Sequence, residues 1–244
     1  MINNIFNDDC FNVFNKIDER IINLVLVDLP FGQTHCKWDN VIDLKEMWKH
    51  LKRICKDNCI YIFFTTTKYG IEIINSNKLW FRYDLVWEKH IAVGFLNARK
   101  MPLRAHEMIY IFSNLKLEKY SLRHTYNPQK TPGKPYKVKE CTIRSDGVYG
   151  IIPKLDMENK TGDRHPRSVI KYHQNDKKLH PTQKPLELCE WLIKSYSNEG
   201  DLVLDFCMGS GTTVKACINT KRNYIGIEKD KDIFNIAKER IEIC

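Results

Sequence analysis

Short apolar runs without polar alternation limit the folds open to this chain more than any other feature. Continuous apolarity over so few residues is typical of strands buried on both faces, as in a parallel sheet covered by helices. We therefore expect five such segments to be strands of one sheet. They lie at residues 24–27, 60–64, 108–112, 202–204 and 224–227.

Segments with helical spacing lie between these runs. Apolar residues recur at intervals of three and four over 44–54, 188–196 and 233–241. Pro185 near the start and Gly200 after the end of the second segment are typical helix boundaries. Strands that alternate with helices predict a doubly wound, mostly parallel, Rossmann-like α/β sheet.

Three of the predicted strands end at acidic residues. Asp28, Asp205 and Glu228 directly follow their apolar runs. Because the carboxyl ends of parallel strands meet at one edge of a sheet, and ligands bind there, we expect the chemistry of the protein at this edge.

A glycine loop, residues 205–213, leads from the fourth run into a helix with the sequence Asp-Phe-Cys-Met-Gly-Ser-Gly-Thr-Thr. Two glycines permit a tight turn whose backbone N–H groups approach a ligand closely. The third glycine of a dinucleotide fingerprint is replaced by Val214, and the loop lacks the Gly-Lys-Ser/Thr of a P-loop. Asp205 would repel a pyrophosphate but can hold an ammonium group, and Glu228 suits a ribose diol. The pattern favours a zwitterionic nucleoside such as S-adenosylmethionine (SAM) over NAD.

A second motif, the corner Asp28-Leu29-Pro30-Phe31, follows the first run. Such a corner can hold a flat base with an exocyclic amine, since the carboxylate accepts one N–H, a turn carbonyl accepts the other, and the ring stacks. Both acceptors together free the nitrogen lone pair for attack on an electrophilic methyl group, and the proline stiffens the turn. Taken alone, such a tetrapeptide is more often an ordinary strand-to-loop turn, because four residues frequently match by chance.

The net charge of +9 is concentrated in one quarter of the chain. Residues 116–178 carry 15 Lys and Arg against 7 Asp and Glu, whereas the other 181 residues carry 24 against 23. Tyrosines and turn formers are interleaved with these cations, which suits a nucleic-acid backbone and stacked bases. A solvated, loop-rich surface is the alternative interpretation.

Cysteine usage and hydropathy exclude several classes of protein. Nine cysteines, an odd number without framework spacing, predict reduced thiols. No apolar run approaches the roughly 18 residues of a membrane span, and the first residues lack the features of a secretory signal. We therefore expect a cytoplasmic protein, and neither a membrane protein nor a secreted one.

Taken together, the motifs resemble those of the β-class amino-group DNA methyltransferases. The corner is similar to the D-P-P-Y motif, with Leu29 for the first proline and Phe31 for tyrosine. The glycine loop resembles the family's SAM loop, and His-Pro-Thr-Gln-Lys-Pro at 180–185 matches a family signature. The corner precedes the glycine loop, which is the circularly permuted motif order of the β class.

The resemblance implies a role for each motif. Asp28, the Leu29 carbonyl, Pro30 and Phe31 would bind the target amine. The Asp9-Cys10 segment would lie by the adenine of SAM, Glu228 by its ribose, and His180, Thr182 and Lys184 by its methionine end. The remaining cofactor contacts would come from the glycine loop, at Asp205, Phe206, Met208, Gly209, Ser210, Gly211 and Thr212.

The resemblance also implies a substrate and a domain organisation. Residues 1–114 and 179–244 would form the catalytic domain, and 115–178 an inserted basic target-recognition region. An acid at position 28 favours adenine N6, because cytosine-N4 relatives commonly carry serine there. The target base would be flipped out of duplex DNA, although single-stranded DNA stays open. Candidate phosphate contacts are Lys37, Arg99, Lys100 and Arg104.

Three alternatives remain from the sequence. A cytosine-N4 enzyme or an RNA methyltransferase would use the same frame, and a non-catalytic nucleic-acid-binding subunit would retain the fold without the chemistry. Methyl transfer of this kind needs no metal, so we expect none. The resemblance leaves a homodimer open.

Overall fold

The chain divides into two compact units. A computed structural model describes residues 1–32, 41–115, 124–141, 155–173 and 183–242. The larger unit comprises Met1–Asn127 and Ser168–Cys244, and the smaller one Pro128–Arg167.

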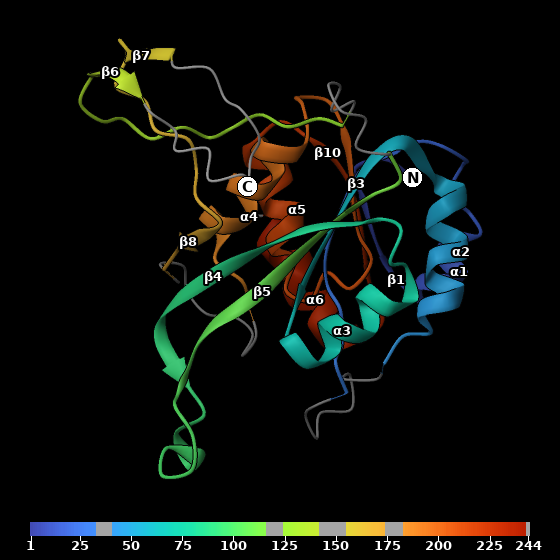
Figure 1. The fold of residues 1–244 in the computed structure, drawn as a ribbon. Coiled ribbons are helices and arrows are strands. Elements are labelled where there is room, and N and C mark those ends of the chain that lie inside the picture. Colours follow the sequence, from blue (N-terminus) through green and yellow to red (C-terminus); the bar gives the residue numbers. More distant parts are fainter. Residues whose placement is uncertain (33–40, 116–123, 142–154, 174–182, 243–244) are drawn as a thin grey trace. The chain divides into compact units, whose positions relative to one another are not determined.

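The larger unit is built on an eight-stranded sheet with the strand order β1-β10-β9-β2-β3-β5-β4-β8 (Figure 1). The five strands from β1 to β3 in this order are mutually parallel. The predicted doubly wound, mostly parallel sheet is therefore confirmed. The strands are β1 (Asn4–Asn7), β2 (Ile22–Asp28), β3 (Cys55–Thr65), β4 (Phe81–Val93), β5 (Arg104–Ser113), β8 (Val169–Lys171), β9 (Leu202–Asp205) and β10 (Asn223–Glu228).

All five predicted strands are present, but the expected direction of one is wrong. The run 108–112 lies in β5, which is antiparallel to both of its neighbours, β3 and β4. Its apolarity has the cause that we inferred, because Ile109 and Ile111 are buried. An apolar run indicates a strand that is buried on both faces of a sheet, but it does not indicate whether that strand is parallel or antiparallel to its neighbours.

Helices cover both faces of the sheet. Successive residues of β2 point to opposite faces, so that Val25 packs with α1, α2 and α3, and Leu26 with α4 and α5. The three predicted helical segments lie in α2, α4 and α6. No helix in the described part of the chain is long and apolar enough to cross a membrane. The helices are α1 (Cys10–Phe14), α2 (Leu44–Ile54), α3 (Thr67–Ser76), α4 (Leu186–Tyr196), α5 (Thr212–Asn219) and α6 (Lys231–Glu242).

The smaller unit is organised around the antiparallel pair β6 (Tyr136–Cys141) and β7 (Leu155–Asn159). A backbone bridge joins Thr131 to Arg164, and the Arg164 guanidinium lies 4.8 Å from the centre of the Tyr136 ring. This unit lies within the basic region 115–178. A role in target recognition stays a prediction.

Candidate active site

The three predicted edge acids end neighbouring parallel strands. Asp28 is the last residue of β2, Asp205 of β9 and Glu228 of β10. These strands are adjacent in the order β10-β9-β2 and run in the same direction. The sheet therefore brings all three carboxylates to its carboxyl edge, as the sequence predicts.

The glycine loop is held in shape from both sides. Gly209 and Gly211 have φ angles of +53° and +77°, which L side chains rarely adopt. Glu228 Oε2 accepts a hydrogen bond from the Gly209 N–H at 3.0 Å. From α6, the Arg240 guanidinium donates to the Ser210 carbonyl at 3.2 Å and to Thr212 Oγ1 at 2.9 Å. The sequence analysis missed Arg240, because the contact joins residues about 30 positions apart.

Gly226, inside β10, lets the glycine loop lie directly against the sheet. A Cβ atom at this position would lie 2.6 Å from Met208 Sδ and 2.9 Å from Val214 Cγ2. Such distances are below van der Waals contact, so a side chain here would force the Met208 and Val214 side chains to move. A glycine within an apolar strand was the available signal for this close approach.

The electrostatics of the loop suit a cationic ligand. Asp205 is 4% exposed and has no ion pair among the described residues. Burial raises the pKa of its carboxyl to about 7, against hydrogen bonds from Thr213 and from the Cys207 N–H. Burial also raises the pKa of Glu228. A buried acid such as Asp205, which has no neutralising cation among the described residues, fits the ammonium charge of SAM.

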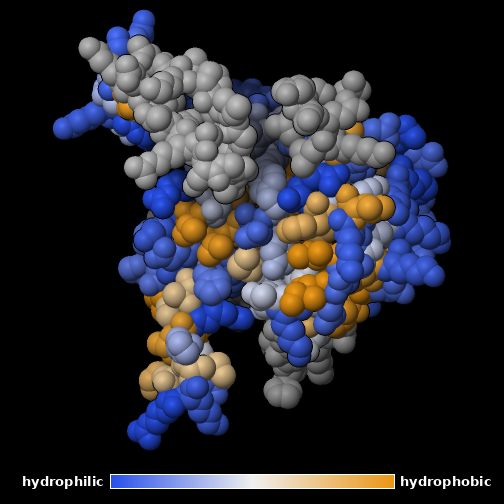
Figure 2. All heavy atoms as spheres, in the orientation of Figure 1, coloured by the Kyte–Doolittle hydropathy of each residue, from blue (hydrophilic) through white to orange (hydrophobic). Residues whose placement is uncertain are grey.

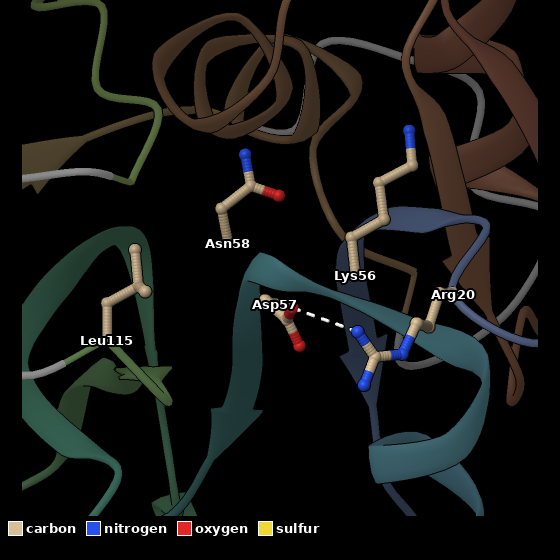
Figure 3. Close-up of a pocket in the computed structure, with 5 residues that line it drawn as sticks. All are labelled: Arg20, Lys56, Asp57, Asn58 and Leu115. Atoms are coloured by element: carbon tan, nitrogen blue, oxygen red, sulfur yellow. Dashed lines mark hydrogen bonds and ion pairs between the residues drawn. The ribbon is translucent and has the colours of Figure 1, made fainter.

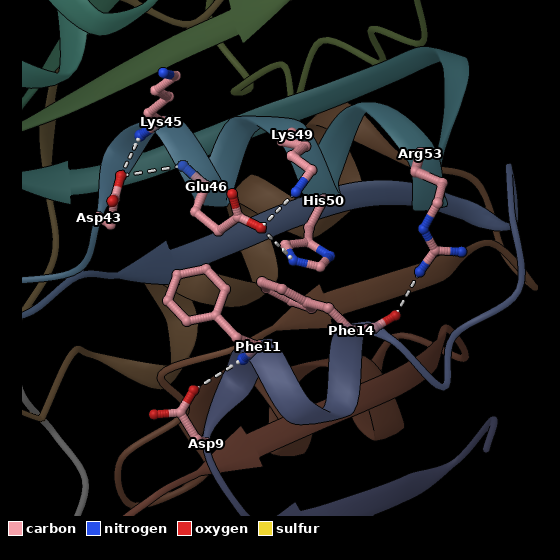
Figure 4. A network of polar contacts seen from close by, with 9 residues as sticks. All are labelled: Asp9, Phe11, Phe14, Asp43, Lys45, Glu46, Lys49, His50 and Arg53. Atoms are coloured by element: carbon pink, nitrogen blue, oxygen red, sulfur yellow. Dashed lines mark hydrogen bonds and ion pairs between the residues drawn. The ribbon is translucent and has the colours of Figure 1, made fainter.

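The Asp9-Cys10 segment lies at the same edge, since Asn7 of β1 pairs with Glu228 of β10. Asp9 caps α1 by accepting the Phe11 N–H at 3.0 Å, as Figure 4 shows, and its other oxygen lies 3.0 Å from Lys229 Nζ. Cys10 is buried, which raises the pKa of its thiol to about 12. Cys10 therefore stays a neutral thiol.

Helix α1 is anchored to α2 by polar contacts (Figure 4). Arg53 donates to the Phe14 carbonyl at 2.6 Å, and the His50 ring lies 5.5 Å from that of Phe14. Glu46 accepts from Lys49 at 2.8 Å and lies 3.2 Å from His50 Nε2. The Arg53 hydrogen bond and the His50–Phe14 ring contact join α2 to α1, which begins after Asp9, whereas the Glu46 contacts lie within α2.

The corner presents one carboxylate oxygen without a partner. Asp28 Oδ2 accepts from Lys184 Nζ at 2.5 Å. Asp28 Oδ1 is buried and accepts no hydrogen bond from the described residues. Leu29 is buried, and the centre of the Phe31 ring lies 5.6 Å from that of Tyr69 in α3. The corner thus holds a fixed acid with a free acceptor beside an aromatic ring.

Asp28 belongs to a row of four alternating charges, which we call the charge quartet. Lys184 also lies 3.4 Å from Glu107 Oε2, and Glu107 in turn forms an ion pair with Lys89. The four side chains come from β2, the segment before α4, β5 and β4. The quartet is Asp28, Lys184, Glu107 and Lys89. Sequence reasoning assigned no role to Glu107 or Lys89, because nothing local to either residue marks these contacts.

Each pKa in the quartet reflects burial opposed by neighbouring charge. Burial raises the pKa of Asp28, and Lys184 limits that rise. For Glu107, burial also acts to raise the pKa, but Lys184 and Lys89 outweigh it and the net shift is downward. Burial lowers the pKa of Lys184, but Asp28 and Glu107 outweigh it and the net shift is upward. Lys184 is consequently a permanent cation that favours ionised Asp28.

The segment that carries Lys184 contacts both motifs. Its neighbour Gln183 accepts a hydrogen bond from Ser210 Oγ of the glycine loop at 3.4 Å. Lys184, predicted to lie by the cofactor, contacts the corner acid. His180 and Thr182, from the same signature, and Lys37 lie outside the described residues.

The other predicted DNA contacts lie apart from these acids. Arg99, Lys100 and Arg104 are exposed on the connection between β4 and β5 and at the start of β5. These three residues lie together on a projecting hairpin and not beside Asp28.

A shallow pocket lies at the opposite edge of the sheet. It has a volume of about 490 Å³ and is lined by Arg20, Lys56, Asp57, Asn58 and Leu115 (Figure 3). The ion pair between Arg20 and Asp57, at 3.0 Å, crosses it. None of the predicted site residues lines this pocket, so it is separate from the candidate active site.

Comparisons with known proteins identify the family. A family model described as DNA methylase, of the N6/N4 type, matches residues 22–239. The type II methyltransferase M.HpaI of Haemophilus parainfluenzae is 45% identical over 96% of this chain and 72% of its own. The type II methyltransferase M1.MboII of Moraxella bovis is 28% identical over 97% of this chain and 95% of its own. The chain therefore belongs to the N6/N4 DNA methylases.

Solved structures agree with this fold. The complex of M1.HpyAVI with SAM aligns with a TM-score of 0.68 at 23% identity, covering 97% of this chain and 98% of that chain. The PvuII DNA methyltransferase, described as cytosine-N4-specific, aligns with a TM-score of 0.66 at 16% identity. The alignment covers 97% of this chain and 85% of that chain. The predicted fold class and methylase family are confirmed. The fold is shared by a cytosine-N4 enzyme, so it does not by itself select the target base.

Proposed function

We propose that this protein is a SAM-dependent type II DNA methyltransferase that methylates the exocyclic N6 of adenine. The observation that carries the proposal is the state of Asp28. One of its carboxylate oxygens is held by Lys184, and the other is buried without a partner among the described residues. An unpartnered buried acceptor is unfavourable unless a ligand supplies the missing hydrogen bond.

An adenine amino group would satisfy this acceptor. Asp28 Oδ1 accepts one N–H and the Leu29 carbonyl accepts the second, which leaves the nitrogen lone pair directed out of the ring plane. Phe31 stacks on the base, and its contact with Tyr69 keeps the ring in place. The bound cofactor supplies an electrophilic methyl group.

The chain's other acids would hold that cofactor. Asp205 faces its ammonium group, Glu228 its ribose and Asp9 its adenine. The two Glu228 oxygens each accept one backbone N–H, from Gly209 and Asp230. A carboxylate oxygen has a second lone pair, so a ribose hydroxyl can add to this arrangement.

The names of relatives support the substrate and the setting. M.HpaI and M1.MboII are type II methyltransferases by name, and a structure of TTHA0409 from Thermus thermophilus was solved with SAM, as was M1.HpyAVI. We accordingly place this enzyme in a restriction-modification system. The cytosine-N4 specificity of the PvuII enzyme makes N4-methylcytosine the second candidate product.

Mass spectrometry of nucleosides tests the proposal directly. The purified protein is incubated with SAM and unmethylated duplex DNA, which is then digested to nucleosides. We expect N6-methyladenine. N4-methylcytosine would refute the adenine assignment and keep the methylase, whereas no methylated base on DNA would refute the proposed function.

The affinity for SAM should depend on pH through Asp205. The ionised carboxylate binds an ammonium group, and the pKa of Asp205 is about 7. An amino-acid α-ammonium stays mostly protonated up to pH 7.5. Protonation of Asp205 should therefore weaken binding by about fivefold between pH 7.5 and pH 6. Isothermal titration calorimetry at pH 7.5 and pH 6 measures the two affinities for SAM. An Asp205→Asn variant is the control and should bind SAM weakly and equally at both pH values. Equal affinities of the wild type at the two pH values would contradict the role assigned to Asp205.

A further inference from the structure

A hairpin formed by β4 and β5 projects beyond the carboxyl edge of the sheet (Figure 1). Thr65, at the end of β3, pairs with Met108, whereas the outermost pair of the hairpin joins Val93 to Arg104. Four residues of strand separate these two positions on β5, which is about 13 Å. The hairpin thus extends past the edge at which Asp28 lies.

The end of this hairpin, residues 94–103, is called the hairpin tip. Gly94, with a φ of +97°, turns the chain into a short 3₁₀ helix at Phe95–Asn97. Phe95 is 81% exposed and Leu96 is 93% exposed, and Met101 and Leu103 lie open beside them. Figure 2 shows apolar and strongly hydrophilic side chains together on this projection, at the lower left. Apolar side chains gathered on one projection indicate an interaction surface.

The charge of the hairpin tip selects the partner. Residues 90–106 contain Arg99, Lys100 and Arg104 and no acidic residue. None of the three has an ion pair with a described residue. Two copies of this surface would repel each other through these cations, whereas a polyanion would be attracted.

We propose that the hairpin tip is a wedge that enters duplex DNA beside the target base. The inference rests on the proposed function. Arg99 and Lys100 contact phosphates, and Phe95 and Leu96 pack against the base pairs that the extruded base leaves behind. A base cannot reach Asp28 while it is stacked, and extruding it costs a few kcal/mol. Inserted apolar side chains offset this by covering the unstacked faces.

The dimensions of the hairpin suit this role. A two-stranded ribbon fits the major groove of B-DNA, which is about 8.5 Å deep. The hairpin projects about 13 Å beyond the sheet edge at its last strand pair, and the tip extends it further. The tip can therefore reach the base stack while the duplex lies across the carboxyl edge.

The first test compares two forms of one substrate. Phe95→Ala/Leu96→Ala and the wild type are assayed with radiolabelled SAM on unmethylated genomic DNA, duplex or heat-denatured. We expect the double variant to lose at least about tenfold in methylation rate on duplex DNA and to stay within about twofold on denatured DNA, since denatured DNA needs no extrusion. Leu79→Ala is the matched control, because Leu79 is 87% exposed before β4 and far from the tip in sequence. It should change neither rate.

The second test measures how much Arg99 and Lys100 contribute to the salt dependence of DNA binding. Binding of a duplex oligonucleotide is followed by fluorescence anisotropy at several salt concentrations. Arg99→Gln/Lys100→Gln should reduce the slope of log K against log salt by about 1.8, because each phosphate contact contributes about 0.9. Lys78→Gln, beside Leu79, should leave the slope unchanged.

Several outcomes would overturn the wedge. They are an unchanged rate of the double variant on duplex DNA, equal losses on both substrates, and an unchanged salt slope. A halved molar mass of the double variant in light scattering would identify the tip as a surface between two copies of the chain. A wild type that methylates neither form would refute the proposed function, and the anisotropy measurement would still test whether the tip binds DNA.

Discussion

An Asp28→Ala variant should transfer methyl groups at least about 100-fold more slowly than the wild type while binding DNA and SAM with unchanged affinity. The carboxylate contacts the reacting amine in the proposed mechanism, and removing one such preorganised hydrogen-bonding group typically reduces the rate 10²–10³-fold. Binding should persist because the proposed phosphate contacts lie on the hairpin and in the basic region, and the proposed cofactor contacts lie on the glycine loop. Single-turnover methylation, anisotropy and isothermal titration measure the three quantities.

The matched control for this variant is Asp57→Ala. Asp57 is also an aspartate in an ion pair, 3.0 Å from Arg20, but it lies at the opposite edge of the sheet. Its removal should leave methylation unchanged. If Asp28→Ala methylated DNA at the wild-type rate, Asp28 would have no role in the mechanism. If the variant lost both DNA binding and SAM binding, the cause would be unfolding rather than a lost catalytic group.

The sequence predicted the centre of the sheet better than its outer strands. Apolar runs marked β2, β3, β9 and β10 because these strands are buried on both faces. β4 was missed, since Arg82, Asp84 and Glu88 interrupt it with solvated side chains. β5 was found but with the wrong direction, because its pairing is set by the hairpin that joins it to β4. Periodicity reports burial, whereas pairing and direction depend on tertiary contacts.

In the candidate active site, too, the sequence predicted what burial determines and missed what depends on tertiary contacts. Acids that end buried strands were predictable, because the strand positions dictate where Asp28, Asp205 and Glu228 lie. Glu107 was not, since its significance depends on Lys184, 77 positions later in the chain. A single sequence contains both residues but nothing that pairs them.

The charge quartet explains how an acid at this position can stay ionised. Asp28 and Glu107 are like charges in a water-poor site, and burial alone would drive protons onto both. Lys184 lies between them, 2.5 Å from one and 3.4 Å from the other, and Lys89 neutralises the outer carboxylate. The four charges sum to zero, so the site holds a carboxylate without a net buried charge.

Removing Lys184 should therefore have the largest effect on stability. Lys184→Met keeps an apolar stem of similar length but leaves two partly buried carboxylates with one lysine. Breaking a buried ion pair in this way destabilises a protein by about 3–5 kcal/mol. Lys229→Met is the control, because Lys229 forms an ion pair with Asp9 at 3.0 Å but is 78% exposed. Its loss should reduce the free energy of unfolding by no more than about 1 kcal/mol in urea titration.

The pH dependence of this effect has a definite sign. Without Lys184 the folded-state pKa of Asp28 rises further above that of the unfolded chain, so between these two pKa values the folded protein holds a proton that the unfolded chain has already released. The loss of stability in Lys184→Met should thus be larger at pH 8 than at pH 5. In the proposed mechanism methylation needs ionised Asp28, so the acid limb of the pH–rate profile of Lys184→Met should move to higher pH.

A second substitution, Glu107→Gln, removes the competing negative charge and should recover part of both the lost stability and the lost rate. Effects of Lys184→Met that are independent of pH and simply add to those of Glu107→Gln would show that Lys184 acts through packing alone.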